Sequence, residues 1–546
     1  MIMGLIRKAG QLLTDPVLRN WTFGRVVGRW PGAPAFNAHR PPYLTDLLPL
    51  TAETPMAEFS ELQDSPPSDA IELCLAGEAL RLVPGDEATL FGRIFDDIEV
   101  TLALHRFAWL PLLGDDADPA WVNAILRAWM KDHAEPADGW AWHPYTAAER
   151  VINILTFAGR SGLPGPVAQS LDLLALHGPA IAERLEYFGD HHTSNHLANN
   201  GRGLFLLGIA LGLPKCAEIG GKILTEEAKR IFAPSGILRE GSSHYHALLA
   251  ASYGQCAEAA RKFDRREAAA LTAVAERARA VTGCLKLPGG FPLIGDISPD
   301  LRPEAILKSL NIPEERDARA LAEDGWYRLD VGPWSGIWHA APDGFSHMPG
   351  HGHQDCGGFE LHYMDQPVFI DPGRGGYGET GDAALYRSAS VHNTLLIDNA
   401  DPYPPNKPYY SEAFRRHMGG PPPRVEQDEE SIRVAHDGFA RLGGPGTLTR
   451  TWRLSPTTMT LSDSIEGRNR HRISRILVTP LDVFPGEDFL ELRGRNQAFR
   501  LTTDGTVSTA PLTRWTAYGQ GVPVTAIRIA SDAALPWRGK LSLETC

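Results

Sequence analysis

The amino-acid sequence predicts a multidomain α+β protein in which a helical half precedes a half rich in antiparallel β-strands. Three observations lead to this fold class. The chain has 546 residues, which is too long for one compact core. From about residue 97 to 290, apolar residues recur at three- and four-residue spacings, as on one face of a helix. Beyond about residue 325, short β-rich runs are punctuated by Gly, Asp and Pro.

The helical half consists of several successive helices. Segments such as WVNAILRAWMKDH and AAERVINILTFAGR place their apolar side chains on one helical face. Short breakers, including Gly-Leu-Pro-Gly at 162–165, separate such segments. Many consecutive helices with short turns indicate an array of antiparallel helical hairpins, and the periodicity is compatible with either a toroid or an open solenoid.

The second half is expected to form a β-sandwich. LTRTWRL and TMTLSDS alternate apolar and polar residues, as half-buried antiparallel strands do. We therefore predict three regions: an irregular, Pro-rich N-terminal segment (1–95) with a short hairpin around 71–83, a helical domain (96–320) and an antiparallel β-sandwich domain (321–546).

Charge and composition exclude some classes of function. The formal net charge is -13 and the calculated pI is about 5.8, whereas a nucleic-acid binder normally presents a basic face. The protein would repel an acidic polymer unless the protein's binding cleft were locally basic. Residues 191–250 contain six Lys or Arg against four Glu, so this stretch does not share the acidic excess. Six scattered cysteines without CxxC pairs indicate isolated thiols rather than a disulfide framework.

The sequence predicts neither a leader nor a membrane span. Arg7 and Lys8 interrupt the few apolar residues at the N-terminus, so the apolar core of a signal peptide is missing. The longest apolar stretch, residues 203–213, is too short to cross a bilayer. A cytoplasmic protein is expected, or a periplasmic one if the start site is assigned wrongly. The oligomeric state is left open.

Two segments of the helical half concentrate polar residues at the start of a helix. HHTSNHLANNGRG (191–203) opens a strongly apolar helix and holds more His and Asn than capping requires. In ILREGSSHYHALLAASYG (237–254), the Glu-Gly-Ser-Ser run precedes Tyr245 in the first turns, where a helix can present a side chain to a cleft. A polar cap in the first segment and a packing tyrosine in the second are the simpler alternatives.

Two segments of the β half bring histidines together. In an extended chain, His351, His353 and Asp355 would share one face. A hairpin then leads back to Asp371, and His392 directly precedes an apolar strand. Imidazole nitrogens and a carboxylate oxygen are ligands that suit Zn²⁺. The alternative is a surface hairpin with solvated histidines, which four His in residues 347–378 make less favourable.

Together these segments resemble the heparinase II/III-like polysaccharide lyases, in which an α/α toroid precedes an antiparallel β-sandwich. The resemblance extends over about residues 95–480 and depends on the order and spacing of its motifs. These are Asn195-His196 before a helix, Tyr245-His246 after an acidic-Gly-Ser run, Ile294-Gly295-Asp296, His351-x-His353 with Asp371-Pro-Gly eighteen residues beyond the second His, and Arg387…His392-Asn393-Thr394.

The resemblance implies roles for individual residues. Asn195 would hold and neutralise a substrate carboxylate, and His196 would act as a base or orient the substrate. Tyr245 would be the general acid or base, with His351 assisting at the carboxylate. A structural Zn²⁺ would be bound by His353, Asp371 and His392. Further contacts with substrate are expected from Arg202, Arg239, His246, Tyr377 and Tyr386; the last two are alternatives for a second tyrosine that relatives take from the β domain. Asn199 stands where some relatives place Glu, which leaves the substrate epimer open.

The implied activity is β-elimination on a uronic-acid-containing polysaccharide, which gives a 4,5-unsaturated product. Alginate, glycosaminoglycans such as heparin-like chains or hyaluronate, and bacterial exopolysaccharides all remain open as the substrate. A glycoside hydrolase is one alternative, because α/α toroids also host paired carboxylates and the helical half contains Glu149, Glu240 and Asp296. A non-catalytic protein of carbohydrate binding or exopolysaccharide assembly is the other.

Overall fold

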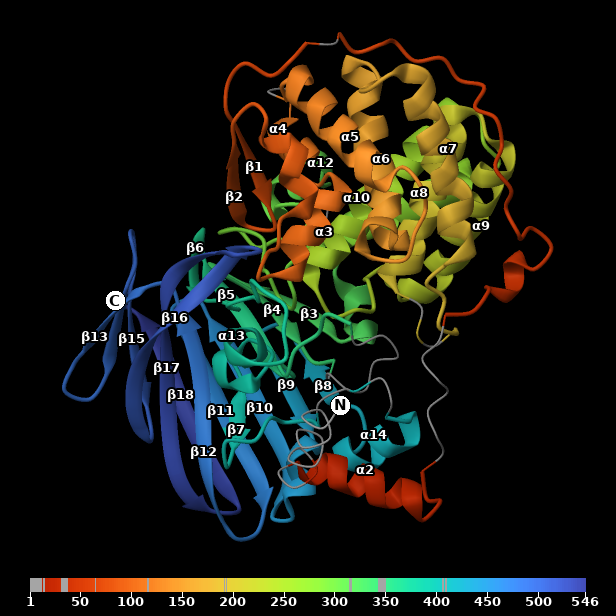
Figure 1. The fold of residues 1–546 in the computed structure, drawn as a ribbon. Coiled ribbons are helices and arrows are strands. Elements are labelled where there is room, and N and C mark those ends of the chain that lie inside the picture. The colour runs from red at the N-terminus through yellow and green to blue at the C-terminus, as the bar shows by residue number, and fades with distance from the viewer. Residues whose placement is uncertain are drawn as a thin grey trace.

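The computed structural model describes residues 12, 15–30, 38–63, 65–114, 117–190, 192, 194–313, 317–341, 350–404, 407 and 410–546. It has the predicted fold class, a helical domain followed by antiparallel β-sheets (Figure 1). In the part of the chain that is described, no helix combines the length and the apolar character that crossing a bilayer requires.

The helical domain is an incomplete α/α toroid. Helices α3, α6, α8 and α10 contact one another in that order. Helices α7, α9 and α11 pack against them. The bounds of the helices are α3 Ile98–Arg106, α4 Trp109–Leu113, α5 Pro119–His133, α6 Pro144–Ser161, α7 Val167–Glu183, α8 Asn195–Leu211, α9 Pro214–Ile231, α10 Ser243–Lys262, α11 Ala268–Leu285 and α12 Pro303–Ser309.

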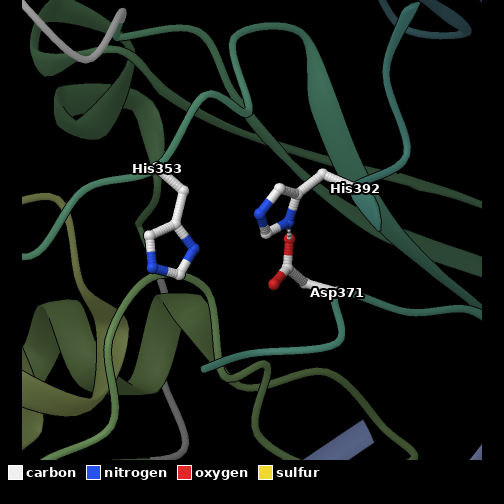
Figure 2. A group of neighbouring side chains, drawn as sticks. All are labelled: His353, Asp371 and His392. Carbon is white, nitrogen blue, oxygen red and sulfur yellow. Dashed lines mark hydrogen bonds and ion pairs between the residues drawn. The ribbon is translucent and has the colours of Figure 1, made fainter. Parts of the chain in front are cut away.

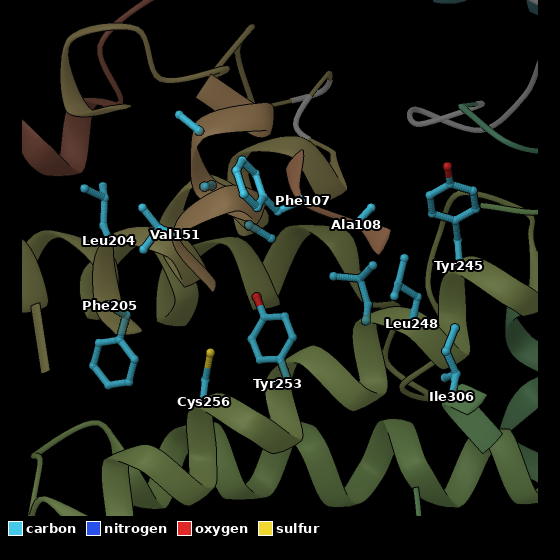
Figure 3. Close-up of a cluster of buried hydrophobic side chains, with 14 of the residues drawn as sticks. Phe107, Ala108, Val151, Leu204, Phe205, Tyr245, Leu248, Tyr253, Cys256 and Ile306 are labelled. Carbon is cyan, nitrogen blue, oxygen red and sulfur yellow. The ribbon is translucent and has the colours of Figure 1, made fainter. Parts of the chain in front are cut away.

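A large apolar core holds these helices together, and it lies on the faces that the sequence periodicity predicts. Figure 3 shows part of it, with Leu204 and Phe205 from α8 and Tyr253 and Cys256 from α10. Tyr245 belongs to the same α10 helix, close to its N-terminus. The core therefore fixes the helix that presents Tyr245.

The N-terminal segment is less irregular than the sequence predicts. Helix α2 (Pro16–Val26) begins where Asp15 caps the backbone and Pro16 supplies a preset φ angle. It lies beside α14 (Glu412–Gly419) at one end of the molecule (Figure 1). A two-stranded hairpin follows, formed by β1 (Ile71–Leu75) and β2 (Glu78–Leu82).

Within the described residues, the C-terminal half contains three antiparallel sheets. An eight-stranded sheet has the order β13-β14-β15-β18-β11-β10-β9-β8, and two four-stranded sheets have the orders β16-β17-β12-β7 and β3-β4-β5-β6. The bounds of the strands are β3 Trp326–Val331, β4 Trp334–His339, β5 Gly358–Tyr363, β6 Gln366–Phe369, β7 Leu395–Ile397, β8 Arg424–Gln427, β9 Ser431–His436, β10 Pro445–Ser455, β11 Thr458–Gly467, β12 Arg470–Thr479, β13 Asp482–Pro485, β14 Leu490–Arg493, β15 Ala498–Thr503, β16 Thr506–Ala517, β17 Gln520–Ala534 and β18 Trp537–Thr545.

The sheets form a sandwich around a second apolar core. Trp334 and Phe359 from one four-stranded sheet and Trp452 from the eight-stranded sheet belong to the same buried cluster. The two smaller sheets meet edge to edge, where the backbone N–H of Ile370 donates to the carbonyl of Val478 at 3.0 Å. The segments around β5, β6 and β7 reach the helical domain, and they carry the histidines that the sequence singles out.

Candidate active site

Two helix entrances present the polar residues of the helical domain. Ser194 caps α8 by accepting a hydrogen bond from the backbone N–H of His196, so Asn195 and His196 lie in the first turn. Ser242 caps α10 in the same way, through the backbone N–H of Tyr245 at 3.1 Å. The capping serines therefore explain locally why both groups stand at helix ends.

Three glycines allow three backbone segments to cross at these helix ends. His351 donates its backbone N–H to the carbonyl of Glu240 at 3.1 Å, and Asp296 donates its own to the carbonyl of His351 at 3.0 Å. Gly295 has φ of +81°, and a Cβ there would lie 2.5 Å from the carbonyl oxygen of Gly241. Gly241 in turn has φ of +73° and approaches the backbone of Gly352. Larger residues would push the His351 loop away.

His351 links the two helix entrances. Its ring stacks on that of Tyr245, with centroids 3.6 Å apart and planes 8° apart. Its Nε2 lies 3.3 Å from Asn195 Nδ2 and 3.3 Å from Glu240 Oε2, and its Nδ1 lies 3.1 Å from Asp296 Oδ2. The structure thus brings together Asn195, Tyr245 and His351, and a carboxylate lies on either side of the imidazole.

Tyr245 has a second tyrosine as its partner. Its hydroxyl oxygen lies 2.6 Å from that of Tyr377, which also donates to the carbonyl of Ile297 at 3.2 Å. Burial raises the pKa of both phenols well above the ordinary value, so both are neutral near pH 7 in the free protein. Tyr386 lies elsewhere, since its hydroxyl bonds the backbone of Thr513 on β16. Of the two tyrosines, only Tyr377 contacts Tyr245.

His196 is held by a buried carboxylate. Its Nδ1 lies 2.7 Å from Glu186 Oε1, and its ring packs against Tyr145 with centroids 4.8 Å apart. Burial opposes charge on the ring, but the charge and hydrogen bond of Glu186 prevail and raise the pKa of His196. A partly exposed imidazole whose charged form Glu186 favours therefore stands beside Asn195, in a protein that is acidic as a whole.

The loop that carries Tyr377 is fastened to both domains through Tyr518, in the turn between β16 and β17. The Tyr518 hydroxyl accepts the backbone N–H of Tyr377 at 3.2 Å and donates to Asp97 Oδ2 at 2.9 Å. Asp97 is the N-cap of α3. Gly77 at the β1–β2 turn packs so closely on Tyr518 that a Cβ would lie 2.4 Å from its carbonyl oxygen. One hydroxyl thus connects the Tyr377 backbone to the helical domain.

Asp296 joins His351 to a second histidine. Its Oδ1 lies 2.9 Å from His353 Nε2, and Arg374 donates to the same carboxylate at 3.0 Å. Burial opposes the charge, yet the hydrogen bonds of His351 and His353 and the charge of Arg374 hold the pKa of Asp296 well below its usual range. Asp296 is therefore an anion shared by both histidines.

His353, Asp371 and His392 form a buried group whose ligand atoms all lie within 4.8 Å of one another (Figure 2). Because Asp296 engages Nε2 of His353, Nδ1 of the same ring remains, and this buried nitrogen has no hydrogen-bond partner among the described residues. His392 Nδ1 lies 2.8 Å from Asp371 Oδ2, and Asp371 raises the pKa of His392 to about 9 although burial opposes it. The orphaned nitrogen and the mixed nitrogen and oxygen donors fit a metal ion, with Asp296 orienting His353 from behind.

Other predicted residues lie outside this cluster. His246 is fully buried in the helical core, where its ring nitrogens contact the backbone at Leu238 and Ala278, and burial lowers its pKa to about 4. Arg202 is paired with Glu149 at 3.1 Å and lines a pocket next to Asn195, and Arg239 is exposed. The carboxylate of Asp355 contacts His339 at 3.1 Å, and its charge also acts on His353 and His392. Positions 191, 193 and 342–349 of the singled-out segments lie outside the described residues.

The carboxylates of the site were not assigned roles from the sequence. Glu240 accepts both the backbone and the side-chain N–H of Asn195 at 2.7 Å, and it precedes the Gly-Ser-Ser run that signals the start of α10. Asp296 follows Gly295, whose left-handed backbone marks a tight turn. Glu186 and Tyr518 give no local signal in the sequence, because only tertiary packing brings them to the site.

The comparison with known families agrees with this architecture. Residues 313–534 match the family model described as heparinase II/III-like, C-terminal. This stretch is therefore similar to the C-terminal domain of the heparinase II/III-like family. No curated protein matches the chain in sequence.

Solved structures share the fold at low sequence identity. Heparinase III has a TM-score of 0.61 at 15% identity, over 83% of this chain and 78% of that chain. The BT4657 gene product, described as heparinase III, has a TM-score of 0.56 at 14% identity, over 98% and 92%. The heparan sulfate lyase HepC from Pedobacter heparinus has a TM-score of 0.53 at 15% identity, over 83% and 77%. These similarities show the fold.

Proposed function

We propose that this protein is a polysaccharide lyase that cleaves a uronic-acid-containing polymer by β-elimination. The observation that carries the proposal is the convergence of Asn195, His351 and the Tyr245–Tyr377 pair at the meeting of the two domains. Amide, imidazole and phenol groups suit proton transfer beside a carboxylate. The fold shared with a heparan sulfate lyase supports the same class of reaction.

The reaction breaks the C5–H bond, forms the C4=C5 double bond and expels the oxygen linked to C4. Loss of the C5 proton places further negative charge on a carboxylate that is already ionised. Asn195 and His351 are assigned to bind that carboxylate and delocalise the charge, and a well-placed donor of this kind contributes about 3–4 kcal/mol. His196, whose charged form Glu186 favours, would contribute to the electrostatic field beside that carboxylate.

The two phenols are assigned to the proton transfers. Because burial keeps both phenols neutral in the free protein, one of them must first lose its proton to solvent; as the phenolate it then takes the C5 proton, and the other donates its proton to the departing oxygen. A phenolate needs a nearby positive group, because the ordinary pKa of tyrosine is about 10. The hydroxyl contact of 2.6 Å between Tyr245 and Tyr377 gives the proton a path back, which restores the starting state.

The metal is assigned a structural role. His353, Asp371 and His392 would hold a zinc ion, which when bound would stiffen the loop that carries His351. Asp296 lies between His353 and His351 and would transmit that rigidity to the ring that stacks on Tyr245. The catalytic groups themselves lie in a separate cluster around Asn195.

A glycoside hydrolase needs one carboxylic acid that remains protonated near neutral pH. Asp296 is poorly suited to that role, because its neighbours hold its pKa low. The test is incubation with alginate, heparin-like chains, hyaluronate and bacterial exopolysaccharides, with ultraviolet absorbance reporting the unsaturated product. New reducing ends without that absorbance would indicate hydrolysis and contradict the proposal. Binding without any product would indicate a carbohydrate-binding protein.

A further inference from the structure

Helix α2 carries apolar side chains on two faces. Val17 and Trp21 lie on the covered face, where they join Trp30, Tyr410 and Phe414 in a small aromatic core shared with α14. The helix is therefore anchored to the body of the protein. Figure 1 shows it beside α14 below the helical domain, at the edge of the molecule.

The other face of α2 presents apolar groups to solvent. Phe23 is 70% exposed, Val26 80% and Val27 56%, and these three positions lie within one turn and a half. Gly24 allows Trp30 to fold back on the covered side, since a Cβ there would lie 2.1 Å from the Trp30 ring. Trp30 therefore covers one face of α2. The face that carries Phe23 is left uncovered by the described residues.

Exposed arginines lie on the same helix and beside it; Arg25 and Arg29 pack over the rings of Trp21 and Trp30 at 5.7 and 5.1 Å. Arg19, Arg25 and Arg29 belong to the helix and the turn after it, and Arg416 lies on the adjacent α14. Residues 15–30 hold three basic residues and one acidic residue, Asp15, in a chain whose net charge is -13. This pole is thus both apolar and basic, whereas the rest of the molecule is acidic.

We propose that the α2 face docks on an anionic phospholipid surface. Apolar side chains with a basic border suit the boundary between headgroups and acyl chains, where the apolar groups enter and the guanidinium groups meet phosphates. The net negative charge of the remainder of the molecule would oppose its approach to the same surface, which favours this pole as the side that faces it. This surface is separate from the candidate active site, so the inference is independent of the proposed function.

The test is co-sedimentation of the full chain with vesicles. The protein pellets with vesicles of phosphatidylcholine mixed with phosphatidylglycerol, remains in solution with phosphatidylcholine alone, and is released by high salt. Phe23→Ser with Val26→Ser lowers the bound fraction about tenfold or more. Arg19→Glu with Arg29→Glu abolishes binding. The matched control is Ile94→Ser, because Ile94 is 97% exposed in another part of the chain and its loss leaves binding unchanged.

Circular dichroism checks that each variant is folded, and light scattering reports the mass in solution. Absence of pelleting with the mixed vesicles, or equal pelleting of wild type and the Phe23/Val26 variant, would overturn the proposal. A dimer that the same variant dissociates, without any vesicle binding, would show that the face joins two copies of this chain and would also overturn it.

Discussion

The hydroxyl oxygens of Tyr245 and Tyr377 lie 2.6 Å apart, although 132 positions separate the two residues in the sequence. Tyr245 stands on the first turns of α10 in the helical domain, and Tyr377 stands on the loop after β6 in the β domain. Their contact therefore requires the two domains to keep a fixed relative position. The groups that hold this position differ from those proposed to bind substrate, so the two sets can be tested separately.

The Tyr518 hydroxyl is a positioning group for Tyr377. Tyr518→Phe removes its hydrogen bonds to the Tyr377 backbone and to Asp97 but keeps the ring. We expect kcat to fall about tenfold with a smaller change in KM, because alignment of reacting groups rather than binding is lost. Steady-state kinetics on an active polymer provide the measurement.

Two variants of Asp97 test whether the bond between Tyr518 and Asp97 causes this fall in kcat. Asp97→Asn keeps an oxygen acceptor and should remain close to wild type, whereas Asp97→Ala should behave like Tyr518→Phe. The matched control is Tyr43→Phe, which removes another tyrosine–carboxylate bond, to Glu227 at 2.5 Å. If Tyr43→Phe lowers kcat as much as Tyr518→Phe, the effect is one of general stability and the positioning role is wrong.

Asp296→Asn should disturb both stability and turnover. The substitution keeps the shape but removes the anion that faces His351, His353 and Arg374. Leaving a buried cation without its partner typically costs about 3–5 kcal/mol, so the free energy of unfolding in urea should fall by that order. Asp317→Asn, in an exposed pair with Arg319, should leave it unchanged. An unaltered urea midpoint for Asp296→Asn would contradict the role of this carboxylate.

His353→Ala should remove the metal. Elemental analysis of the purified protein is expected to give about one equivalent of zinc in wild type and far less in the variant. A chelator should lower the melting temperature of wild type but not that of the variant. His246→Ala serves as the control, because it also removes a fully buried imidazole but lies outside the triad. Equal metal content in all three proteins would reject the site.

The Glu186–His196 pair should give stability a definite pH window. Glu186 raises the pKa of His196, so this contribution is complete below the ordinary histidine value of about 6.5 and is lost as pH rises through the raised pKa. Although burial opposes it, His196 lowers the pKa of Glu186, so that contribution is present above the ordinary value of about 4.3 and is lost as pH falls through the lowered pKa.

Glu186→Gln tests this window directly. Without the Glu186 carboxylate, the weaker effect of the Glu240 charge remains against burial, so the pKa of His196 should fall below its value in wild type. An NMR titration of the His196 ring measures the shift. If its pKa is the same in both proteins, Glu186 does not control the charge beside Asn195.

The fold class could be predicted because its signals are local. Helical spacing before residue 290 and two-residue alternation beyond 325 are properties of short segments. Each half can therefore be recognised from the local sequence, without tertiary information. Helix α2 escaped prediction because its apolar residues occupy two faces rather than one. Its exposed side does not show the one-sided pattern that identifies a helix in a Pro-rich region.

The candidate site could be predicted only in part. Asn195, Tyr245 and His351 attract attention as polar residues at breaks in apolar patterns, and the structure brings them together. His246 was grouped with its neighbour, yet successive residues on a helix point about 100° apart, and it faces the core instead. The choice between Tyr377 and Tyr386 depends on the path of one loop, which no local pattern encodes.

The most direct test of the central claim is the Tyr245→Phe variant assayed for unsaturated product against wild type. The phenol is 5% exposed and packs on His351, so phenylalanine should keep the fold while removing the hydroxyl that faces Tyr377. We predict that wild type releases an ultraviolet-absorbing product from at least one uronate polymer, and that the variant loses about a hundredfold or more of that rate. A folded Tyr245→Phe protein that keeps the wild-type rate would contradict the account.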